Sequence, residues 1–366
     1  MSASSGAQGV AVIFDKDRLR LARQLNGIRK SQLAELIDVS AQAVGQYESG
    51  VSKPRPATLA RIALQLGFPL EFFGSRGDPV PDLETSGTFF RSLRRTSQLE
   101  RERAVAHAAL AALIVQDLER RIRFPALDLP EGLELEPDDD PARAEDAAMA
   151  VRAAWELGDG PVDHVVHTME AHGVVVFRLS TDTPNVDAFS RFFGERPVIA
   201  LSTNKDVRER SRFDAAHELG HLVMHHDPEP ASQPLERQAH RFAAGFLMPR
   251  DAIEDRLPRQ HVDWLELIML KREWGVSLQA LLYRARQLGV MTPTAYESAM
   301  KTMARKGWRK AEPGDVGTPE QPDLLRQAFD LLEQNGSSLE QTANSLALPP
   351  ARVRELVPAA LDLTRG

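Results

Sequence analysis

The chain has 366 residues, 42% of them hydrophobic and 27% charged, which is the composition of an ordinary globular protein of about two or three domains. Cysteine is absent, so disulfide scaffolds, thiol nucleophiles and cysteine-ligated metal centres are excluded, and any metal site must use histidine and carboxylate side chains. The net charge of −7 argues, taken alone, against a protein that binds nucleic acid through its bulk charge.

No export signal is indicated near the N-terminus, because no basic segment precedes an apolar core of about 7–15 residues. No apolar run reaches about 18 residues either. We therefore expect a cytoplasmic protein without a membrane partner.

Composition divides the chain into four regions. Residues 15–74 form a compact run of short helical segments, and residues 75–140 form a helical and acidic linker. Residues 141–290 alternate helix-like and strand-like segments, and residues 291–366 form a helical C-terminal region. The predicted fold class is multidomain: an all-α N-terminal domain, an α+β domain with a small antiparallel sheet, and a helical C-terminal region.

The first region departs from the charge of the whole chain, since it holds nine basic and six acidic residues and so has a net charge of +3. We expect Ser31 and Ser40 to cap the second and third of its helices. One side of these helices is predicted to be buried, through Leu33, Ala34, Ile37, Val44 and Tyr47. Short helices are predicted over residues 19–25, 31–37, 41–50 and 57–66.

The exposed side of the third predicted helix carries Ala41, Gln42, Gly45 and Gln46. Small side chains permit close approach to base edges, and a glutamine can form two hydrogen bonds with adenine. A helix presented to the major groove by a tight turn is the helix-turn-helix geometry. The alternative is a small helical domain that makes protein contacts only.

These residues resemble the lambda-repressor-like (XRE) helix-turn-helix family over about 60 residues. The matching features are Ser31-Gln32, Leu33-Ala34, Val39-Ser40, Tyr47-Glu48-x-Gly50 and the run from Pro54 to Ala63. The resemblance implies that Gln32 contacts a phosphate, that Gln42 and Gln46 face bases, and that a homodimer binds a double-stranded operator. The predicted DNA-binding residues are Gln32, Ser40, Ala41, Gln42, Gln46, Lys53 and Arg55.

The third region is predicted to contain an antiparallel meander of three strands between helices. The expected strands cover residues 174–177, 186–193 and 198–201, and the expected helices cover residues 141–156, 162–172, 207–226 and 234–247.

A His-Glu-x-x-His run lies on the helix predicted over residues 207–226. His217 and His221 are four residues apart and project from one helix face, so that they can bind one Zn²⁺. Glu218 is placed to act as a general base toward water at that metal. A third ligand is needed, and Glu236 is the preferred candidate. The rival candidates are His240, His225 and Asp227.

This region resembles the ImmA/IrrE family of zinc metallopeptidases, over roughly residues 141–290. The matching pieces are Arg212-Phe213-x-x-Ala216-His217-Glu218-Leu219-Gly220-His221 and Glu236-x-x-Ala239-x-x-Phe242-Ala243-x-x-x-Leu247-Met248-Pro249. The resemblance implies a zincin-like fold with His217, His221 and Glu236 as metal ligands and Glu218 as the catalytic residue. Two positions depart from the family pattern, because His240 replaces a common asparagine and Asp214 replaces a frequent threonine.

The sequence thus predicts a DNA-binding regulator with a zinc-dependent peptidase domain. Family resemblance implies that the substrate is a helix-turn-helix repressor or the chain itself, in a stress or mobile-element response. Two alternatives stay open: a transcription factor whose metal domain senses a ligand without cutting, and a toxin–antitoxin or phage-defence component. Residues 342–349 weakly resemble a second helix-turn-helix opening, but Pro349-Pro350 at the turn favours a packing or dimerisation role.

Overall fold

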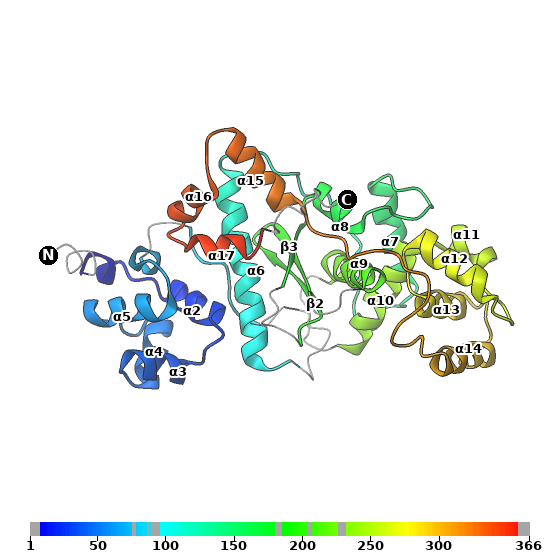
Figure 1. The fold of residues 1–366 in the computed structure, drawn as a ribbon, viewed down its shortest axis with the longest axis horizontal. Coiled ribbons are helices and arrows are strands. Elements are labelled where there is room, and N and C mark those ends of the chain that lie inside the picture. The colour runs from blue at the N-terminus through cyan, green and yellow to red at the C-terminus, as the bar shows by residue number, and fades with distance from the viewer. Residues whose placement is uncertain are drawn as a thin grey trace.

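The computed structural model describes residues 8–74, 78–85, 88, 96–179, 185–203, 207–225 and 232–357 (Figure 1). The N-terminal helices lie at one end of an elongated molecule, the small sheet lies near its middle, and α11 to α14 lie at the other end. Within these residues, no helix is both long enough and apolar enough to cross a membrane.

Short helices build the N-terminal domain, as predicted. Ser40 caps α4 as expected, since its side chain accepts a hydrogen bond from the Ala43 amide at 3.1 Å. The expected cap at Ser31 is wrong, because α3 begins one residue earlier, after Arg29, and the Gln32 side chain accepts from the Arg29 amide at 2.7 Å. The elements are α2 (Lys16–Leu25), α3 (Lys30–Ile37), α4 (Ala41–Ser49), α5 (Pro56–Leu66) and η1 (Leu70–Phe73).

A buried ion pair joins the first of these helices to the third. Arg23 of α2 donates from Nε to Glu48 Oε1 at 2.5 Å and from Nη2 to Glu48 Oε2 at 3.1 Å. Arg23 also donates to the Ile28 carbonyl oxygen at 2.7 Å. The two side chains are 4% and 2% exposed, and Lys30 Nζ lies 3.4 Å from Glu48 Oε2, so the two buried charges are stabilised mainly by each other.

The segment expected to be a linker contains the long helix α6 (Gln98–Glu119), which is mostly buried. Its Ala- and Leu-rich middle packs against α2, against the central strand of the sheet and against the C-terminal helices. Ser97 and Glu100 form a capping box at its start.

The sheet contains β1 (Val175–Arg178), β2 (Ala188–Phe193) and β3 (Arg196–Leu201) in the order β1-β3-β2. The prediction of a purely antiparallel meander is wrong, because β3 pairs antiparallel with β2 but parallel with β1. Gly194, with φ of 63°, lies in the tight turn that reverses the chain between β2 and β3. Five of the six residues of β3 are buried, as suits the central strand of the sheet.

The two faces of the sheet contribute to two different apolar cores. Val198 and Ala200 of β3 point into the core that contains α6 and the N-terminal helices. Ile199 and Leu201 point to the opposite side, into the core that contains α9 (Arg208–Met224) and α10 (Gln233–Leu247). Because side chains alternate between the two faces along β3, this one strand contributes to both cores and connects them.

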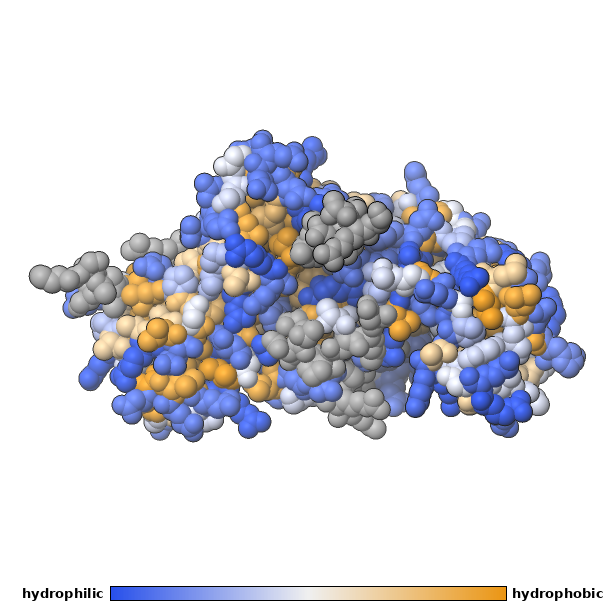
Figure 2. All heavy atoms as spheres, in the orientation of Figure 1, coloured by the Kyte–Doolittle hydropathy of each residue, from blue (hydrophilic) through white to orange (hydrophobic). Residues whose placement is uncertain are grey.

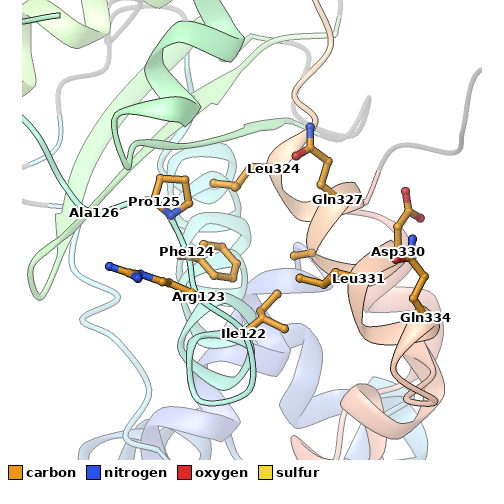
Figure 3. Close-up of a pocket in the computed structure, with 11 residues that line it drawn as sticks. Ile122, Arg123, Phe124, Pro125, Ala126, Leu324, Gln327, Asp330, Leu331 and Gln334 are labelled. Carbon is orange, nitrogen blue, oxygen red and sulfur yellow. The ribbon is translucent and has the colours of Figure 1, made fainter.

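Further helices complete the second core and the C-terminal region. In chain order the remaining elements are α7 (Arg143–Ala154), α8 (Val165–Ala171), α11 (Arg250–Ile253), η2 (Glu254–Arg256), α12 (Trp264–Trp274), α13 (Leu278–Gln287), α14 (Pro293–Arg305), α15 (Leu324–Gln334), α16 (Leu339–Ser345) and α17 (Pro350–Arg354). Between residues 122–126 and α15 lies a groove of about 720 Å³, toward which Ile122, Leu324 and Leu331 point (Figure 3).

Two buried glutamates attach the C-terminal region to the rest of the chain. Glu320 pairs with Arg212 of α9 and accepts a hydrogen bond from the Val166 amide at 3.0 Å. Glu170 of α8 accepts hydrogen bonds from the amides of Asp323 and Leu324, at 3.0–3.1 Å, and so caps the start of α15. Burial outweighs these hydrogen bonds and raises the pKa of Glu170 to about 7.

Replacing Glu48 by alanine is expected to remove both side-chain hydrogen bonds that buried Arg23 makes to a carboxylate, leaving Glu102, 3.9 Å away, as its acidic partner. The free energy of unfolding of the N-terminal domain should fall by about 3–5 kcal/mol. Urea denaturation of Glu48→Ala, followed by circular dichroism, measures this loss. Glu35→Ala on the exposed side of α3 is the control and should change stability by less than about 0.5 kcal/mol. Equal stability of the two variants would contradict the role given to the ion pair.

The raised pKa of Glu170 predicts a pH dependence of stability. The folded state retains this proton up to pH about 7, whereas the unfolded chain releases it near pH 4.5, so the contribution of Glu170 is complete below pH 4.5 and declines as pH rises toward 7. Relative to Glu170→Gln, the wild-type protein should lose on the order of 3 kcal/mol across that interval. Unfolding curves of both proteins at several pH values between 4 and 8 test this; parallel pH profiles would contradict it.

Candidate active site and DNA-binding surface

The His-Glu-x-x-His run lies in the middle of α9, which packs tightly against α10. A side chain at Gly220 would meet the Phe242 ring of α10, with the nearest ring atom 2.9 Å from the Cβ position. The absence of a side chain at Gly220 thus lets the two helices approach closely. This approach places Glu236, in the first turn of α10, opposite the two histidines of α9.

His217, His221 and Glu236 converge on one point. The Nε2 atoms of the two histidines are 3.1 Å apart, and Glu236 oxygens lie 3.3 Å from His217 Nε2 and 3.6 Å from His221 Nε2. Donor atoms about 2.0–2.1 Å from a tetrahedral zinc ion would be separated by about 3.3 Å. The donor set and its spacing therefore fit a zinc ion.

The site is deeply placed and electrostatically suited to a cation. The two histidine side chains are 0% and 1% exposed, and that of Glu236 is 28% exposed. Burial alone would raise the pKa of Glu236, but the hydrogen bonds and charges of His217 and His221 hold this pKa well below its usual range. The carboxylate is therefore ionised at neutral pH.

A chain of hydrogen bonds behind His221 fixes its orientation. Gln238 donates from Nε2 to the Glu136 carbonyl oxygen at 2.8 Å, so its Oε1 faces His225 Nε2, 2.9 Å away. His225 then carries its proton on Nε2, and its Nδ1 accepts from His221 Nδ1 at 3.0 Å. This leaves the lone pair of His221 Nε2 directed at the point where the three donors meet.

The geometry favours Glu236 over the other three candidates for the third metal ligand. His225 uses both ring nitrogens in the chain behind His221. The ring of His240 lies edge-on to that of His217, with centroids 5.2 Å apart, but His240 is outside the converging group. Asp227 lies outside the described residues.

Glu218, which follows His217, is held by the sheet. Ser190 of β2 donates from Oγ to Glu218 Oε2 at 2.8 Å, and Glu218 is only 1% exposed. Ser190 shares the α9-facing side of the sheet with its register partner Ile199. Ser190 and Gln238 are not among the site residues predicted from the sequence, where the lone serine of the strand Ala188–Phe193 was the only signal for Ser190.

A cleft of about 900 Å³ lies beside the site. Phe213, Asp214 and His240 form its end nearest to His217, and α13, α14 and residues 308–317 complete its walls. Asp214, at one of the positions that depart from the family pattern, is buried and pairs with Arg210, with 3.9 Å between Nε and Oδ2.

The residues predicted to contact DNA lie on α3, at the N-cap of α4, on α4 itself and on the loop after it. Ala41 and Gln42 are exposed at the start of α4, and Gln46 is half-buried one turn later. Lys53 and Arg55 are exposed on the loop, where Lys53 Nζ donates to the Val12 carbonyl oxygen at 2.6 Å. Gln32 and Ser40 are also exposed, although both take part in helix capping.

Comparison with protein families agrees with both parts of the structure. Residues 19–73 match the family model described as helix-turn-helix, and residues 169–286 match the peptidase-family model described as the IrrE N-terminal-like domain. A search of curated proteins finds no match. Fold and family matches thus define a DNA-binding regulator that carries a peptidase-family domain. More specifically, the chain joins an XRE-type helix-turn-helix domain to an ImmA/IrrE-like domain.

Proposed function

We propose that the peptidase-family domain is a zinc-dependent peptidase with His217, His221 and Glu236 as metal ligands. The observation that carries this proposal is the convergence of two buried imidazoles and one carboxylate within 4.8 Å of one another. Three protein ligands leave one position of a tetrahedral site for water or substrate, as in catalytic zinc sites. A zinc ion bound there would polarise a peptide carbonyl and lower the pKa of water.

Glu218 is the proposed general base. Its carboxylate takes a proton from the attacking water and then transfers it to the amine of the departing peptide. Ser190, which donates to Glu218 Oε2 at 2.8 Å, is a positioning residue that fixes the carboxylate plane. The chain from Gln238 through His225 keeps His221 in the tautomer that can bind metal.

The cleft beside His240 is the proposed binding site for the substrate polypeptide. Its walls combine aromatic side chains, Tyr283, Tyr296 and Trp308, with several charged ones. The resemblance to ImmA/IrrE peptidases supports a helix-turn-helix repressor as the substrate, either a partner or this chain itself, within a stress or mobile-element response.

For the N-terminal domain we propose operator binding through α4. Gln42 and Gln46 read bases, and Gln32, Ser40, Ala41, Lys53 and Arg55 contact the backbone or allow close approach. A homodimer is proposed, because such domains bind two half-sites. The domain exposes large apolar side chains that could form the dimer interface, and Figure 2 shows apolar surface over this end of the molecule. They are Val12, Leu36, Val51 and Leu64, which are 49–77% exposed.

Replacing Glu218 by glutamine is expected to abolish peptide cleavage while metal binding persists. The rate constant for cleavage of a random decapeptide library, followed by mass spectrometry, should fall at least ~100-fold. Elemental analysis should still find about one zinc per chain. Glu236→Gln is the matched variant and should lose zinc as well as activity. Zinc-loaded wild-type protein that cuts no peptide would instead support the sensing alternative.

The double variant Gln42→Ala, Gln46→Ala is expected to lose discrimination among DNA sequences. Removing the hydrogen bonds of either glutamine to its base should cost about 1–3 kcal/mol on duplexes that the wild-type protein selects from a random pool. Lys53→Ala should weaken binding to all duplexes alike and reduce the slope of log affinity against log salt by about 1. Unchanged sequence selection by the double variant would show that α4 does not read bases.

A further inference from the structure

The C-terminal helices repeat the order and spacing of the N-terminal ones. Adding 309 to the residue numbers of α2 and α3 gives the positions of α15 and α16 to within one residue at each end, and adding 309 to the first residue of α4 gives the first residue of α17. The same shift relates the connecting turns, so that Asn26-Gly27 corresponds to Asn335-Gly336. Both glycines have positive φ, at 62° and 79°.

The hydrogen bonds of the two units coincide under this shift. After the first helix, an asparagine side chain donates to the carbonyl oxygen four residues earlier, from Asn26 to Ala22 and from Asn335 to Leu331, at 2.8 Å in both units. At the start of the second helix, a glutamine side chain accepts from the capping residue's amide, at 2.7 Å for Gln32 with Arg29 and 3.0 Å for Gln341 with Ser338.

The turn between the second and third helices also coincides. Asp38 and Ala347 are both left-handed, with φ of 56° and 53°. The next residue donates its amide to the carbonyl oxygen five residues earlier, from Val39 to Ala34 at 3.0 Å and from Leu348 to Ala343 at 2.7 Å. A left-handed residue other than glycine is uncommon, so its recurrence at the same place marks the same turn.

Apolar burial follows the same correspondence. Ala34, Ile37 and Val44 are buried in the first unit. Ala343, Leu346 and Val353 are the equivalent buried residues of the second. Pro349 and Pro350, which at the sequence level favour a packing role over a helix-turn-helix, occupy the N-cap and the first position of α17, and proline is well tolerated at the first helical position.

The second unit keeps a glutamine at the position of Gln32, namely Gln341, but it lacks the two glutamines with which the first unit is proposed to read bases. Ala351 and Glu355 stand where Gln42 and Gln46 stand, and an acidic side chain at a base-contacting position opposes phosphate approach. The described residues 324–357 contain four acidic and three basic side chains, a net charge of −1.

The third helix of the second unit instead contacts the first unit. Arg352 of α17 donates from Nη2 to Asn26 Oδ1 at 3.0 Å, and its guanidinium lies 5.7 Å from the centre of the Phe68 ring. The preceding helix, α16, is attached to α6 and to the turn after it. Ser345 donates to Asp117 Oδ1 of α6 at 3.3 Å, and Arg121, two residues after the end of α6, donates to Thr342 Oγ1 at 3.0 Å. Figure 1 shows α15 to α17 beside α6.

We propose that residues 324–357 form a second helix-turn-helix unit, whose third helix binds the N-terminal DNA-binding domain of the same chain in place of DNA. This unit fixes the DNA-binding domain against α6. Through the cap that Glu170 provides to α15, it also connects that domain to α8 and the peptidase-family domain. The proposal does not depend on peptidase activity.

The test compares Arg352→Ala with Arg354→Ala in the full chain by amide hydrogen exchange. Arg354 lies on the same helix, but its side chain is 58% exposed and pairs with Glu340 of its own unit, so it is the matched control. Arg352→Ala should speed exchange about tenfold or more in residues 22–28 and 64–70, and Arg354→Ala should not. Arg352→Gln, which keeps most of the side-chain packing, gives the same comparison if the alanine variant unfolds.

A second measurement addresses DNA binding by α17. Affinity for a random-sequence 40-base-pair duplex, measured over a range of salt concentrations, should be the same for Arg354→Ala and the wild-type protein. Weaker binding with a salt slope reduced by about 1 would identify α17 as a DNA-contacting helix and overturn the proposal. Unchanged hydrogen exchange in both Arg352 variants would overturn it as well.

Discussion

Burial of β3 on both of its faces is the constraint on which the rest of the structure depends. Ile199 and Leu201 pack toward α9, while Val198 and Ala200 pack toward α6. The first pair sets the distance between the sheet and the helix that carries the two histidines. The second pair attaches the same strand to the long helix on which α2 and α16 also rest. A single strand therefore fixes the position of α9, which carries the proposed active site, relative to α6, on which the DNA-binding domain rests.

The proposed metal site follows from this placement. Once α9 lies on the sheet, Ser190 reaches Glu218, and the close approach at Gly220 brings Glu236 to the histidines. Residues on the side of His221 away from the proposed metal orient this ligand. The direction of the Gln238 amide determines which ring nitrogen of His225 is protonated, and this in turn determines which ring nitrogen of His221 is protonated. The site is thus arranged by residues that do not themselves touch a metal.

Much of this could be predicted from the sequence, because the patterns involved are local. Spacings of a few residues determine the helix that carries His217 and His221 and the helix start that Ser40 caps. Such spacings can be read directly from a sequence. Strand order could not be predicted in the same way, because the parallel pairing of β1 with β3 depends on which strand becomes buried on both faces. Ser190 and Gln238 were missed for a related reason: their roles exist only between elements distant in the sequence. The C-terminal repeat is only weakly indicated by the sequence, because Pro349-Pro350 can interrupt a turn as well as begin a helix.

X-ray absorption spectroscopy of the zinc-loaded protein tests the proposed ligand set most directly. If His217, His221 and Glu236 hold the metal, the spectrum contains two imidazole nitrogens at about 2.0–2.1 Å, completed by oxygen donors, and His221→Ala loses one imidazole. Three imidazoles would show that His225 or His240 binds the metal in place of Glu236, and would contradict the arrangement in which His225 orients His221.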